Sequence, residues 1–327
     1  MKQPLVSIVI VCYNAKPFLK DCYDSVRALN YPKDRIEVIL ADNASTDDSV
    51  EFTRKNYPWV RVLQLDQNYG YTEGNNRGLA AAAGEYVMFL NQDTKVDPNW
   101  LAELVKVVES DDRIGIAGSL VRDFNKPKLI QNAENRIDIF GSLIHKGWGE
   151  EDSGQFKEPK DVFFVSGVAI MIRKSLMNEL RYCFDKTYFM YFEEVDLCWR
   201  VNLLGYRVVL VPSSIVYHKG NMVPEKVKPE NILRMTRNKI MSFRKNLSFP
   251  LRHILLVPVL LRTFVAVAYW FSKGMWPFGL KFLSALTAQV NHDLNIGNIS
   301  WKRQLQVFSM PDFGSYFRFL KISGKFK

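Results

Sequence analysis

The sequence predicts an α/β protein with a doubly wound, mainly parallel sheet, followed by a basic helical region. Over the first 120 residues, short β-rich runs alternate with helical patterns. Strand and helix in turn indicate parallel βαβ units. The composition changes after Gly220, where cations and long apolar runs replace this alternation. With 327 residues, 47% of them hydrophobic, the chain is long enough for one large domain or two medium ones.

The N-terminal elements follow one another in a regular order. The patterns predict strands at 5–11, 36–41, 60–65 and 85–90, and helices at 16–28, 46–55 and 99–109. Asp47 and Asp48 stand in the first turn of the second helix, where acidic residues favour the helix dipole. The stretch 68–78, rich in Gly and Asn, is expected to be a loop whose glycines let the backbone approach a ligand, followed by a helix that starts near Asn75 to Arg77 and ends near Ala83.

The following hundred residues are less regular. Residues 114–158 show no clear period and are expected to be an excursion that shapes an acceptor site. A strand at 161–172, helices at 174–180 and from 193 to 204, and short strands at 206–211 and 215–218 complete the expected elements. Gly205 is placed to end the acidic helix in the left-handed conformation typical of helix C-termini.

The positive charge belongs to the C-terminal third. Residues 1–218 carry 26 Lys and Arg against 30 acidic residues, and residues 219–327 carry 18 against 4, so the two parts are −4 and +14. This excess coincides with apolar and aromatic runs, a combination that fits an anionic membrane surface better than nucleic acid. We therefore expect a membrane partner and no nucleic acid.

The apolar run 254–271 is the strongest membrane candidate. It is interrupted by Pro258 and Arg262, whereas a crossing helix needs about 20 residues and a central Arg costs at least about 2.5 kcal/mol. An interfacial or re-entrant helix is therefore favoured over a full span. The segments 276–290 and 308–326 mix aromatic residues with cations, as amphipathic elements at the headgroup level do. A helical subdomain packed on the catalytic core is the alternative.

The cysteines and the N-terminus indicate a cytoplasmic setting. Cys12, Cys22, Cys183 and Cys198 have neither the density nor the spacing of a disulfide framework or a zinc site. Met1 to Pro4 runs directly into the first strand, with no leader pattern. We expect a protein attached peripherally or monotopically to the inner face of the cell membrane.

Polar residues follow several of the predicted strands. Asp93 comes after the apolar run 85–90, at the strand end where open α/β sheets bind ligands, and so is a candidate metal ligand. Tyr13 and Asn14 follow the first strand and are placed to meet a nucleotide. Asp42, after the second strand, is placed to accept hydrogen bonds from a base or ribose. Ser45 to Asp47 fit turn and capping roles better.

Three carboxylates crowd the start of the acidic helix: Glu193, Glu194 and Asp196. Close like charges and apolar walls raise a carboxylate's pKa towards the range useful for a general base. The preceding aromatic stretch, 188–192, suits stacking on a sugar. The alternative, acidic residues favouring a helix N-terminus, explains their sign but not these rings.

In this order the motifs resemble one family, the inverting family 2 glycosyltransferases of the GT-A fold, particularly its rhamnosyl- and galactofuranosyltransferase-like branch. The resemblance covers residues 6–220. It rests on Tyr13-Asn14, Asp42-Asn43-Ala44-Ser45-Thr46-Asp47, the stretch 68–78, Leu90-Asn91-Gln92-Asp93, Glu193-Glu194-Val195-Asp196-Leu197-Cys198-Trp199-Arg200, and His218. It implies a GT-A fold: a mixed, mainly parallel sheet flanked by helices.

The resemblance implies a metal site and a base. Asp93 matches the last position of the family's Asp-x-Asp motif, which holds Mn²⁺ or Mg²⁺ against the donor diphosphate, while Asn91 replaces the first Asp. His218 matches a histidine that completes the coordination. Glu194 occupies the base position, more often Asp in this branch, and Glu193 remains an alternative. Asp196 is expected to orient the acceptor or to pair with Arg200.

The resemblance also implies two sets of binding residues. The expected donor-binding residues are Tyr13, Asn14, Asp42, Asn43, Gly70, Asn75, Asn76, Asn91 and Gln92. The expected acceptor-binding residues are Gly167, Trp199 and Arg200.

The expected protein is thus a metal-dependent, inverting glycosyltransferase that moves a sugar from a UDP- or dTDP-sugar to a glycan acceptor, on a polyprenyl or dolichyl diphosphate carrier. Residues 1–220 form its catalytic domain, about 1–110 for the donor and about 111–220 for the acceptor and base, and 221–327 its basic, amphipathic helical region. A non-catalytic sugar-nucleotide or glycan-binding protein on the same fold is one alternative. A nucleotidyltransferase is another, although the first strand lacks the Gly-rich phosphate loop such enzymes need.

Overall fold

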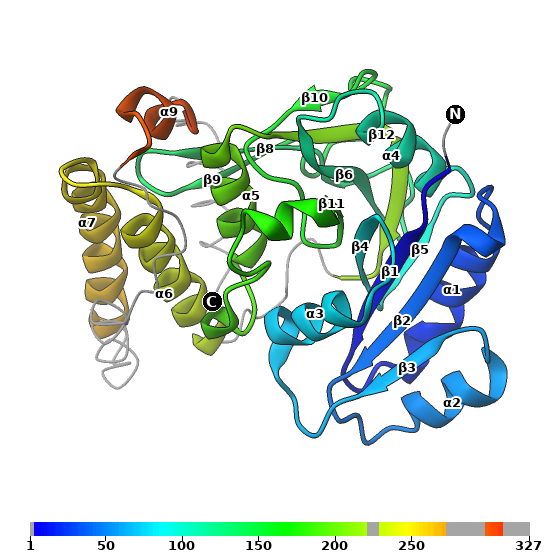
Figure 1. Cartoon of the computed structure of the whole chain (residues 1–327). Coiled ribbons are helices and arrows are strands. Elements are labelled where there is room, and N and C mark those ends of the chain that lie inside the picture. The colour runs from blue at the N-terminus through cyan, green and yellow to red at the C-terminus, as the bar shows by residue number, and fades with distance from the viewer. Residues whose placement is uncertain (1–2, 221–228, 273–297, 310–327) are drawn as a thin grey trace. The chain divides into compact units, whose positions relative to one another are not determined.

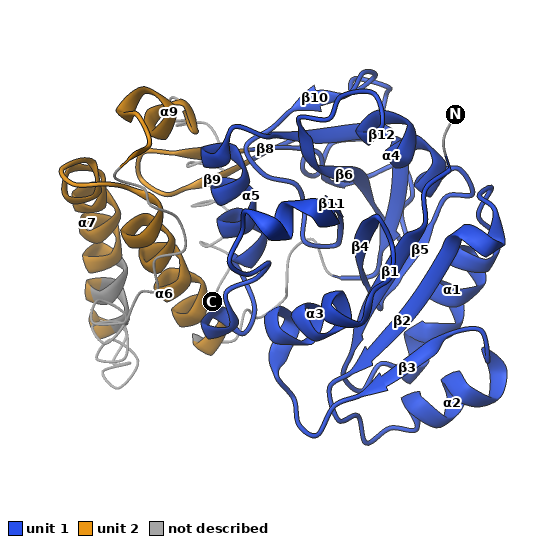
Figure 2. Ribbon diagram, viewed as in Figure 1, with its two compact units in different colours: residues 1–135, 145–222 blue, residues 136–144, 223–327 orange. Residues whose placement is uncertain are grey.

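The computed structural model describes residues 3–220, 229–272 and 298–309, and the chain divides into two compact units. Unit 1 comprises residues 1–135 and 145–222, and unit 2 comprises 136–144 and 223–327 (Figure 2). The division at 222/223 lies near the composition change at Gly220. The short segment 136–144 joins unit 2, which no sequence pattern indicates. Residues 1–110 and 111–220 do not form separate units.

Unit 1 is built on a ten-stranded sheet whose main path runs β10-β12-β6-β11-β4-β1-β2-β3 (Figure 1). Strands β4, β1, β2 and β3 are parallel, β11 is antiparallel to both β4 and β6, and β12 is parallel to β6. The strands are β1 (Val6–Cys12), β2 (Ile36–Asp42), β3 (Arg61–Gln64), β4 (Tyr86–Asn91), β5 (Thr94–Val96), β6 (Ile114–Asp123), β7 (Ile130–Asn132), β10 (Lys160–Asp161), β11 (Ala169–Arg173) and β12 (Arg207–His218).

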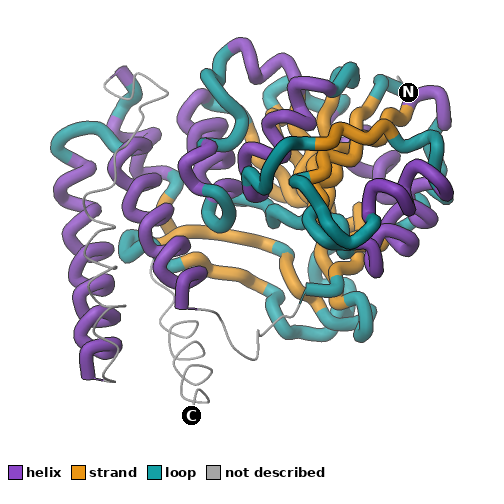
Figure 3. The backbone as a smooth tube through the Cα atoms, turned by 90° about the horizontal axis from the view of Figure 1, so that it is seen from below, coloured by secondary structure: helices purple, strands orange, loops and turns teal. Residues whose placement is uncertain are grey.

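Helices cover both faces of this sheet, as the view from below shows (Figure 3). The unit's α-helices are α1 (Lys16–Arg27), α2 (Ser49–Asn56), α3 (Gly70–Ala81), α4 (Trp100–Val108) and α5 (Glu193–Leu204). Side chains of β1 alternate between the faces: Ile8 and Ile10 lie in one buried cluster with Leu19 of α1 and Leu104 of α4. Val9 and Val11 point to the other face, against α3. The core therefore has two layers, and the α/β expectation is confirmed.

Helix α3 occupies most of the stretch 68–78, so the expectation of a loop there was wrong. A Cβ added to Gly74 or Gly78 would lie 3.0 Å and 2.2 Å from Val11 Cγ1 and Val9 Cγ1 respectively. At Gly70 it would lie 2.5 Å from the carbonyl oxygen of Phe189. Glycine lowers helix propensity by about 1 kcal/mol, but here its four-residue spacing lets a helix lie close on β1. These glycines serve packing and not ligand approach.

Three further expectations need correction. Residues 114–158 contain β6, a central strand, and the expected strand 161–172 is divided between β10 and β11. The expected helix at 174–180 is a 3₁₀ helix, Lys174–Asn178, like the shorter ones at Lys33–Arg35 and Lys186–Tyr188. The two strands expected at 206–218 are one strand, β12, whose register against β6 shifts between Val211 and Ile215. Gly205 ends α5 with φ of 95°, as predicted.

Unit 2 is a helical layer with a small sheet. It holds α6 (Pro229–Asn246), α7 (Leu251–Ser272) and α9 (Trp301–Gln306), and β13 (Phe308–Ser309) pairs with β8 (Glu134–Asp138), which pairs with β9 (Leu143–Lys146). Helices α6 and α7 pack on each other, with Phe243, Leu255 and Val259 buried. Among the described helices none combines the length and apolarity of a membrane-crossing segment. The segment 276–290 and residues 310–326 lie outside the described residues.

Candidate active site

The carboxyl ends of β1, β2 and β4 are tied together by side-chain to backbone hydrogen bonds. Asn14 N–H donates to Ser45 Oγ at 3.0 Å, and Asn14 Oδ1 accepts from Thr46 N–H at 2.8 Å. Tyr13 N–H donates to Gln92 Oε1 at 3.2 Å, which links the end of β1 to the residues after β4. The strand-end residues predicted from sequence are thus brought to one edge of the sheet.

Asp42 and Asn43 are buried at the end of β2 and keep acceptor capacity. Asp42 Oδ2 accepts from Ser45 N–H at 3.1 Å, and Asn43 Nδ2 donates to Gly70 O at 2.9 Å. The other side-chain oxygens, Asp42 Oδ1 and Asn43 Oδ1, are buried and have no hydrogen-bond partner within the described residues. A buried acceptor without a donor is costly, so these two oxygens mark a place where a ligand's N–H or O–H groups fit.

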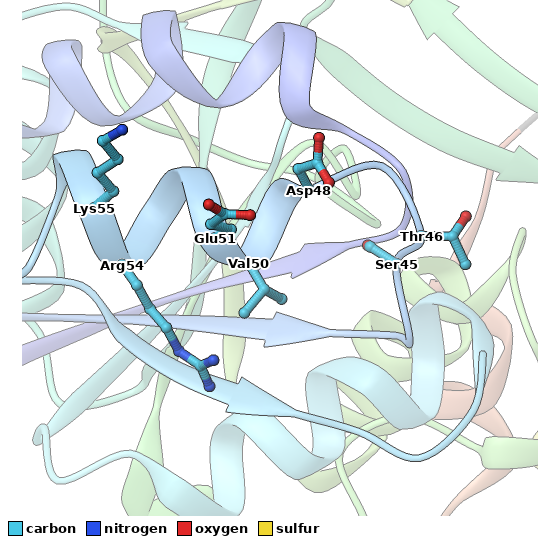
Figure 4. Close-up of a pocket in the computed structure, with 7 residues that line it drawn as sticks. All are labelled: Ser45, Thr46, Asp48, Val50, Glu51, Arg54 and Lys55. Atoms are coloured by element: carbon cyan, nitrogen blue, oxygen red, sulfur yellow. The ribbon is translucent and has the colours of Figure 1, made fainter.

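The turn after β2 is mainly a capping device. Asp47 Oδ2 accepts from Lys16 N–H at 3.0 Å and Asp47 Oδ1 from Ser49 N–H at 3.2 Å, so one carboxylate serves the first turns of α1 and α2. A hollow of about 560 Å³ adjoins this turn, with Ser45 and Thr46 at one end and Arg54 and Lys55 at the other (Figure 4). Neither Asp93 nor Glu194 lines it, so it touches only the β2 edge of the candidate site.

Strand β5 pairs antiparallel with β12, with Thr94 opposite His218. This pairing brings Asp93, the residue before Thr94, next to His218. Asp93 Oδ1 lies 3.3 Å from His218 Nε2. Burial favours the neutral acid, but the hydrogen bond and charge of His218 outweigh it and hold the pKa of Asp93 below its usual range. No group of three or more His, Cys, Asp or Glu that suits a metal occurs among the described residues. Any ion here would take its remaining ligands from substrate or water.

Gln131 of β7 was not predicted from sequence, yet it contacts His218 directly. Its Oε1 lies 2.9 Å from His218 Nδ1, and its Nε2 donates to the carbonyl oxygens of His218 and Gly220, both at 3.0 Å. It also reaches Asp123 Oδ2 at 3.2 Å. A lone Gln in an irregular stretch carries no sequence signal, and only the pairing of β7 with β6 brings it to the end of β12.

Glu193 and Glu194 begin α5 in a desolvated setting. Burial, reinforced at Glu193 by the neighbouring charge of Glu194, raises the pKa of Glu193 well above its usual range. Burial also raises the pKa of Glu194, to about 7. Each keeps a buried Oε2 with no partner in the described part of the chain. Both carboxyls therefore hold protons near neutral pH far more readily than an exposed Glu.

Gly167 lies beside Glu194, in a segment that also contacts the end of β4 near Asp93. A Cβ on Gly167 would lie 3.7 Å from Glu194 Cδ, so only a glycine leaves this side of the carboxyl open. Tyr71 of α3 donates its hydroxyl to Gly167 O at 2.6 Å, a contact that the sequence did not indicate. The next residue, Val168, accepts a hydrogen bond from Asn91 N–H at 2.9 Å. The segment beside Glu194 is therefore bonded to the end of β4, two residues before Asp93.

Asp196, Trp199 and Arg200 are in the interior, so their expected contacts with an acceptor are corrected here. Arg200 Nε bonds Asp196 Oδ2 at 3.0 Å, with both side chains at most 1% exposed. Trp199 is fully buried, edge-on to Phe163 with ring centroids 5.6 Å apart. Arg200 also binds Tyr182 O at 2.9 Å and Cys183 O at 2.5 Å, so this pair holds the segment before the carboxylates. Of the two roles foreseen for Asp196, the structure shows the pairing.

The side chains of Asn75 and Asn76 also bond within the protein. Asn76 Nδ2 donates to Phe184 O at 2.8 Å, and Asn76 Oδ1 accepts from Phe184 N–H at 3.0 Å. Asn75 Nδ2 donates to Tyr71 O at 2.9 Å. Asn76 thus ties α3 to the backbone of Phe184, Asn75 bonds within the helix, and Gly70 fits closely against Phe189. The donor contacts expected of these three residues stay predictions.

Backbone strain within the described residues gathers at the candidate site. All six non-glycine residues with positive φ flank it: Asn14, Ala44, Asp48, Phe189, Tyr191 and Phe192. Three of them, with φ of 64°, 70° and 74°, are bulky aromatics within the four residues before Glu193. Such residues cost roughly 1–3 kcal/mol each and persist where the surrounding structure enforces them. The turn that presents the two carboxylates is therefore held under strain.

The comparison with protein families agrees with this site. Residues 7–181 match the model of glycosyl transferase family 2. The chain belongs to this family, and it is a glycosyltransferase. The carboxyl ends of β1, β2 and β4 lie within the matched residues, and the Glu193–Glu194 turn follows them.

Two relatives are a rhamnosyltransferase and a polysaccharide synthase. It is 30% identical over 242 residues to an N-acetylglucosaminyl-diphospho-decaprenol L-rhamnosyltransferase of Mycobacterium tuberculosis, covering 66% of this chain and 77% of the relative. It is 24% identical over 229 residues to a poly-beta-1,6-N-acetyl-D-glucosamine synthase of Staphylococcus epidermidis, covering 68% of this chain and 51% of the relative. The chain thus spans about half the length of the synthase.

Solved structures share the fold. A mannosyltransferase from Pyrobaculum calidifontis, in complex with GDP-Man and Mn²⁺, aligns with a TM-score of 0.57 at 17% identity, over 88% of this chain and 87% of that one. Residues 1–349 of TarS from S. aureus, in complex with UDP-GlcNAc, align with a TM-score of 0.60 at 18% identity, over 86% and 79%. GalNAc-T7, with UDP, GalNAc and Mn²⁺, gives 0.64 at 18%, over 77% of this chain and 49% of that one.

Proposed function

We propose that this glycosyltransferase moves a sugar, with inversion, from a UDP- or dTDP-sugar to a glycan carried on a polyprenyl or dolichyl diphosphate. It would act with Mn²⁺ or Mg²⁺ at the inner face of the cell membrane. The observation that carries the proposal is Glu194, whose pKa is raised by burial to about 7 and which lies beside Gly167, where the next residue, Val168, is hydrogen-bonded to Asn91 at the end of β4. An inverting transfer needs one such base to take the proton of the attacking hydroxyl.

The donor end is supported by the edge of β1, β2 and β4. Asp42 Oδ1 and Asn43 Oδ1 are acceptors suited to the N–H groups of a pyrimidine or the hydroxyls of a ribose. Tyr13 and Asn14 border the same edge, and Tyr13 is 47% exposed, so its ring is open to a base. Asn91 and Gln92 follow β4 next to Asp93, where the diphosphate would lie.

Asp93 and His218 fit a hard divalent cation. Neighbouring ligands of an octahedral ion, each about 2.1 Å from it, stand about 3.0 Å apart, and the Asp93 and His218 atoms are 3.3 Å apart. One carboxylate oxygen and one imidazole nitrogen leave the remaining positions to phosphate oxygens and water, as is common for Mg²⁺ and Mn²⁺. When bound, the ion would neutralise the charge of the departing diphosphate. The low pKa of Asp93 keeps this side chain ionised for that task.

The choice between Glu193 and Glu194 as base favours Glu194. A base must be able to reach the acceptor hydroxyl, and burial raises the pKa of both carboxyls, so exposure decides between them. Glu193 is only 6% exposed, whereas Glu194 borders the open side of Gly167. In this arrangement Glu194 accepts the proton of the acceptor hydroxyl.

A lipid-linked acceptor is supported by the mycobacterial relative's name and by α7. Five large apolar side chains of α7 are 47–69% exposed: Ile254, Val257, Leu261, Phe264 and Val265. Most of them are three or four residues apart, so they lie along one side of the helix. Arg262 is turned away from them and donates to Ser142 Oγ within unit 2. An apolar stripe without charge, in a C-terminal third of charge +14, suits insertion at an anionic membrane interface.

The donor is tested by a thermal-shift screen of nucleotide sugars in the presence of Mn²⁺, followed by transfer assays with the donors that bind. A UDP- or dTDP-sugar should raise the melting temperature, because a ligand of the folded state stabilises it. Transfer to a short-chain polyprenyl diphosphate glycan should follow. Stabilisation by another nucleotide alone, or transfer only to a soluble glycan, would contradict the donor and acceptor proposed.

Membrane contact is tested by sedimentation with vesicles containing phosphatidylglycerol. The full chain should sediment with them, and the double variant Leu261→Asp, Val265→Asp should lose most of this binding. Met235→Asp, which charges an exposed apolar residue of α6, is the matched control and should sediment as wild type does. Equal binding by the double variant would remove α7 from the proposal.

A further inference from the structure

The orientation of the Gln131 amide is fixed by its neighbours. Its Nε2 faces three oxygens, the carbonyls of His218 and Gly220 and Oδ2 of Asp123, at 3.0–3.2 Å. Carbonyl oxygens only accept hydrogen bonds, so the amide nitrogen must be on this side. The amide oxygen is then the atom that faces His218 Nδ1 at 2.9 Å.

This orientation determines where the imidazole carries its proton. Oε1 of Gln131 can only accept, so Nδ1 of His218 must be the donor. With Nδ1 protonated, the second proton of a charged ring is on Nε2, where it can bond Asp93 Oδ1, 3.3 Å away. When the ring is neutral, Nε2 carries the lone pair, and a cation can take the place of that proton between the two atoms.

The ring is also confined from a second side. A Cβ on Gly220 would lie 2.2 Å from His218 Cε1, so the chain folds over the imidazole in a way that only glycine permits. Gln131 binds the carbonyl of this same Gly220. One amide therefore holds the ring nitrogen, the backbone of His218 and the turn that covers the ring.

We infer that Gln131 is a positioning residue for the cation site, which fixes the tautomer and the orientation of His218 so that Nε2 is available as a ligand. The inference rests on the proposed role of Asp93 and His218 in metal binding. Removing such a partner of a metal-bound His typically lowers metal affinity by 10–100-fold. Gln131 touches neither donor nor acceptor in this scheme and acts through His218 alone.

The test compares wild type with Gln131→Leu, using ¹⁵N-labelled histidine in the metal-free protein and Mn²⁺ binding followed by EPR with UDP or dTDP present. Wild-type His218 should show the Nδ1–H tautomer. In Gln131→Leu this preference should be lost, and the Mn²⁺ affinity should fall 10–100-fold. His253, exposed on α7, provides an internal reference whose signals should not change. Gln131→Met keeps an unbranched side chain and replaces the Leu variant if that protein does not fold.

The outcomes separate the two proposals. A variant whose His218 signals match those of wild type overturns the role of Gln131, whatever its Mn²⁺ affinity. A shifted tautomer with unchanged Mn²⁺ affinity also overturns it, because the positioning would then have no effect on the ion. If wild type binds no Mn²⁺ with either nucleotide, the proposed metal site fails, while the tautomer measurement still reports whether Gln131 controls His218.

Discussion

The Asp93–His218 pair and the Glu193–Glu194 pair both hold carboxyls that are largely shielded from water, but the protein shifts the pKa values of these carboxyls in opposite directions. Against the cost of burial, a hydrogen bond and a positive partner lower the pKa of Asp93. Burial without such a partner raises the pKa of both glutamates. The difference shows that burial alone does not decide a carboxyl's state. What decides it is whether the fold supplies a cation or hydrogen-bond donors.

This contrast assigns different tasks to the two ends of the site. A carboxylate that stays ionised is suited to hold a cation, and a carboxyl poised near neutrality is suited to exchange a proton.

Removing the base should have the largest effect. Glu194→Gln keeps the shape of the side chain but cannot accept a proton, so the transfer rate should fall by about 10³-fold. Donor binding, measured by thermal shift, should remain close to that of wild type. Glu193→Gln is the matched control: because Glu193 is not the proposed base, an amide of the same shape should cost far less activity. A larger loss in Glu193→Gln would exchange the two roles.

Removing the charge at the cation end comes next. Asp93→Asn should lower Mn²⁺ affinity in the presence of nucleotide by at least about 10-fold, because the remaining ligand is a single imidazole. Asn91→Asp introduces the carboxylate that this chain lacks and should strengthen Mn²⁺ binding by roughly 10-fold. Calorimetric titration of both proteins checks the pair. Unchanged Mn²⁺ affinity in Asp93→Asn would show that the ion does not bind at Asp93.

The pH dependence of activity should reveal the raised pKa of the Glu194 carboxyl. Glu194 accepts a proton only when ionised, so kcat/KM should rise with pH and level off above the Glu194 pKa of about 7. For a glutamate with the usual pKa, the rise of kcat/KM would lie near pH 4.5. A rate that is flat between pH 5.5 and 8 would contradict the assignment; the stability of the protein across this range needs to be measured alongside.

The smallest expected effect is on stability. The pKa of Glu194 is higher in the folded than in the unfolded state, so the stability that this one group contributes is fully present below about pH 4.5 and is lost as the pH rises through 7. Glu194→Gln escapes this loss and should be more heat-stable than wild type at pH 8, by at most about 3 kcal/mol. The difference should vanish near pH 4.5. Thermal melting at both pH values checks it, and equal melting at pH 8 would contradict the desolvated environment.

The sequence allowed the strand-end half of the site to be predicted because each polar group directly follows an apolar run. Asp42, Asp93 and His218 all lie where a parallel sheet delivers its carboxyl ends, so chain order and strand alternation sufficed. The alternation itself predicted the order of β1 to β4 with errors of one or two residues at their ends.

The other half depended on contacts between distant segments, which a single sequence does not show. Trp199 and Arg200 look suited to a sugar but are buried, because α5 is surrounded by protein on all sides, as its weak amphipathic pattern reflects. The first turns of helix α3 were not predicted, because glycines lower helix propensity. Only the structure shows that these glycines pack against Val9 and Val11. Gln131 carries no signal until β7 pairs with β6.

The three left-handed aromatics before Glu193 have a consequence for directed evolution. A glycine would adopt the same backbone angles with less conflict, but at Phe192, which is 4% exposed, the loss of the buried ring would outweigh that relief, so a screen that rewards only heat resistance is expected to gather glycine substitutions at the less buried Phe189 and Tyr191. Such winners would loosen the aromatic framework around the carboxylates and turn over more slowly. Libraries of this enzyme therefore need turnover as a second criterion whenever that turn is randomised.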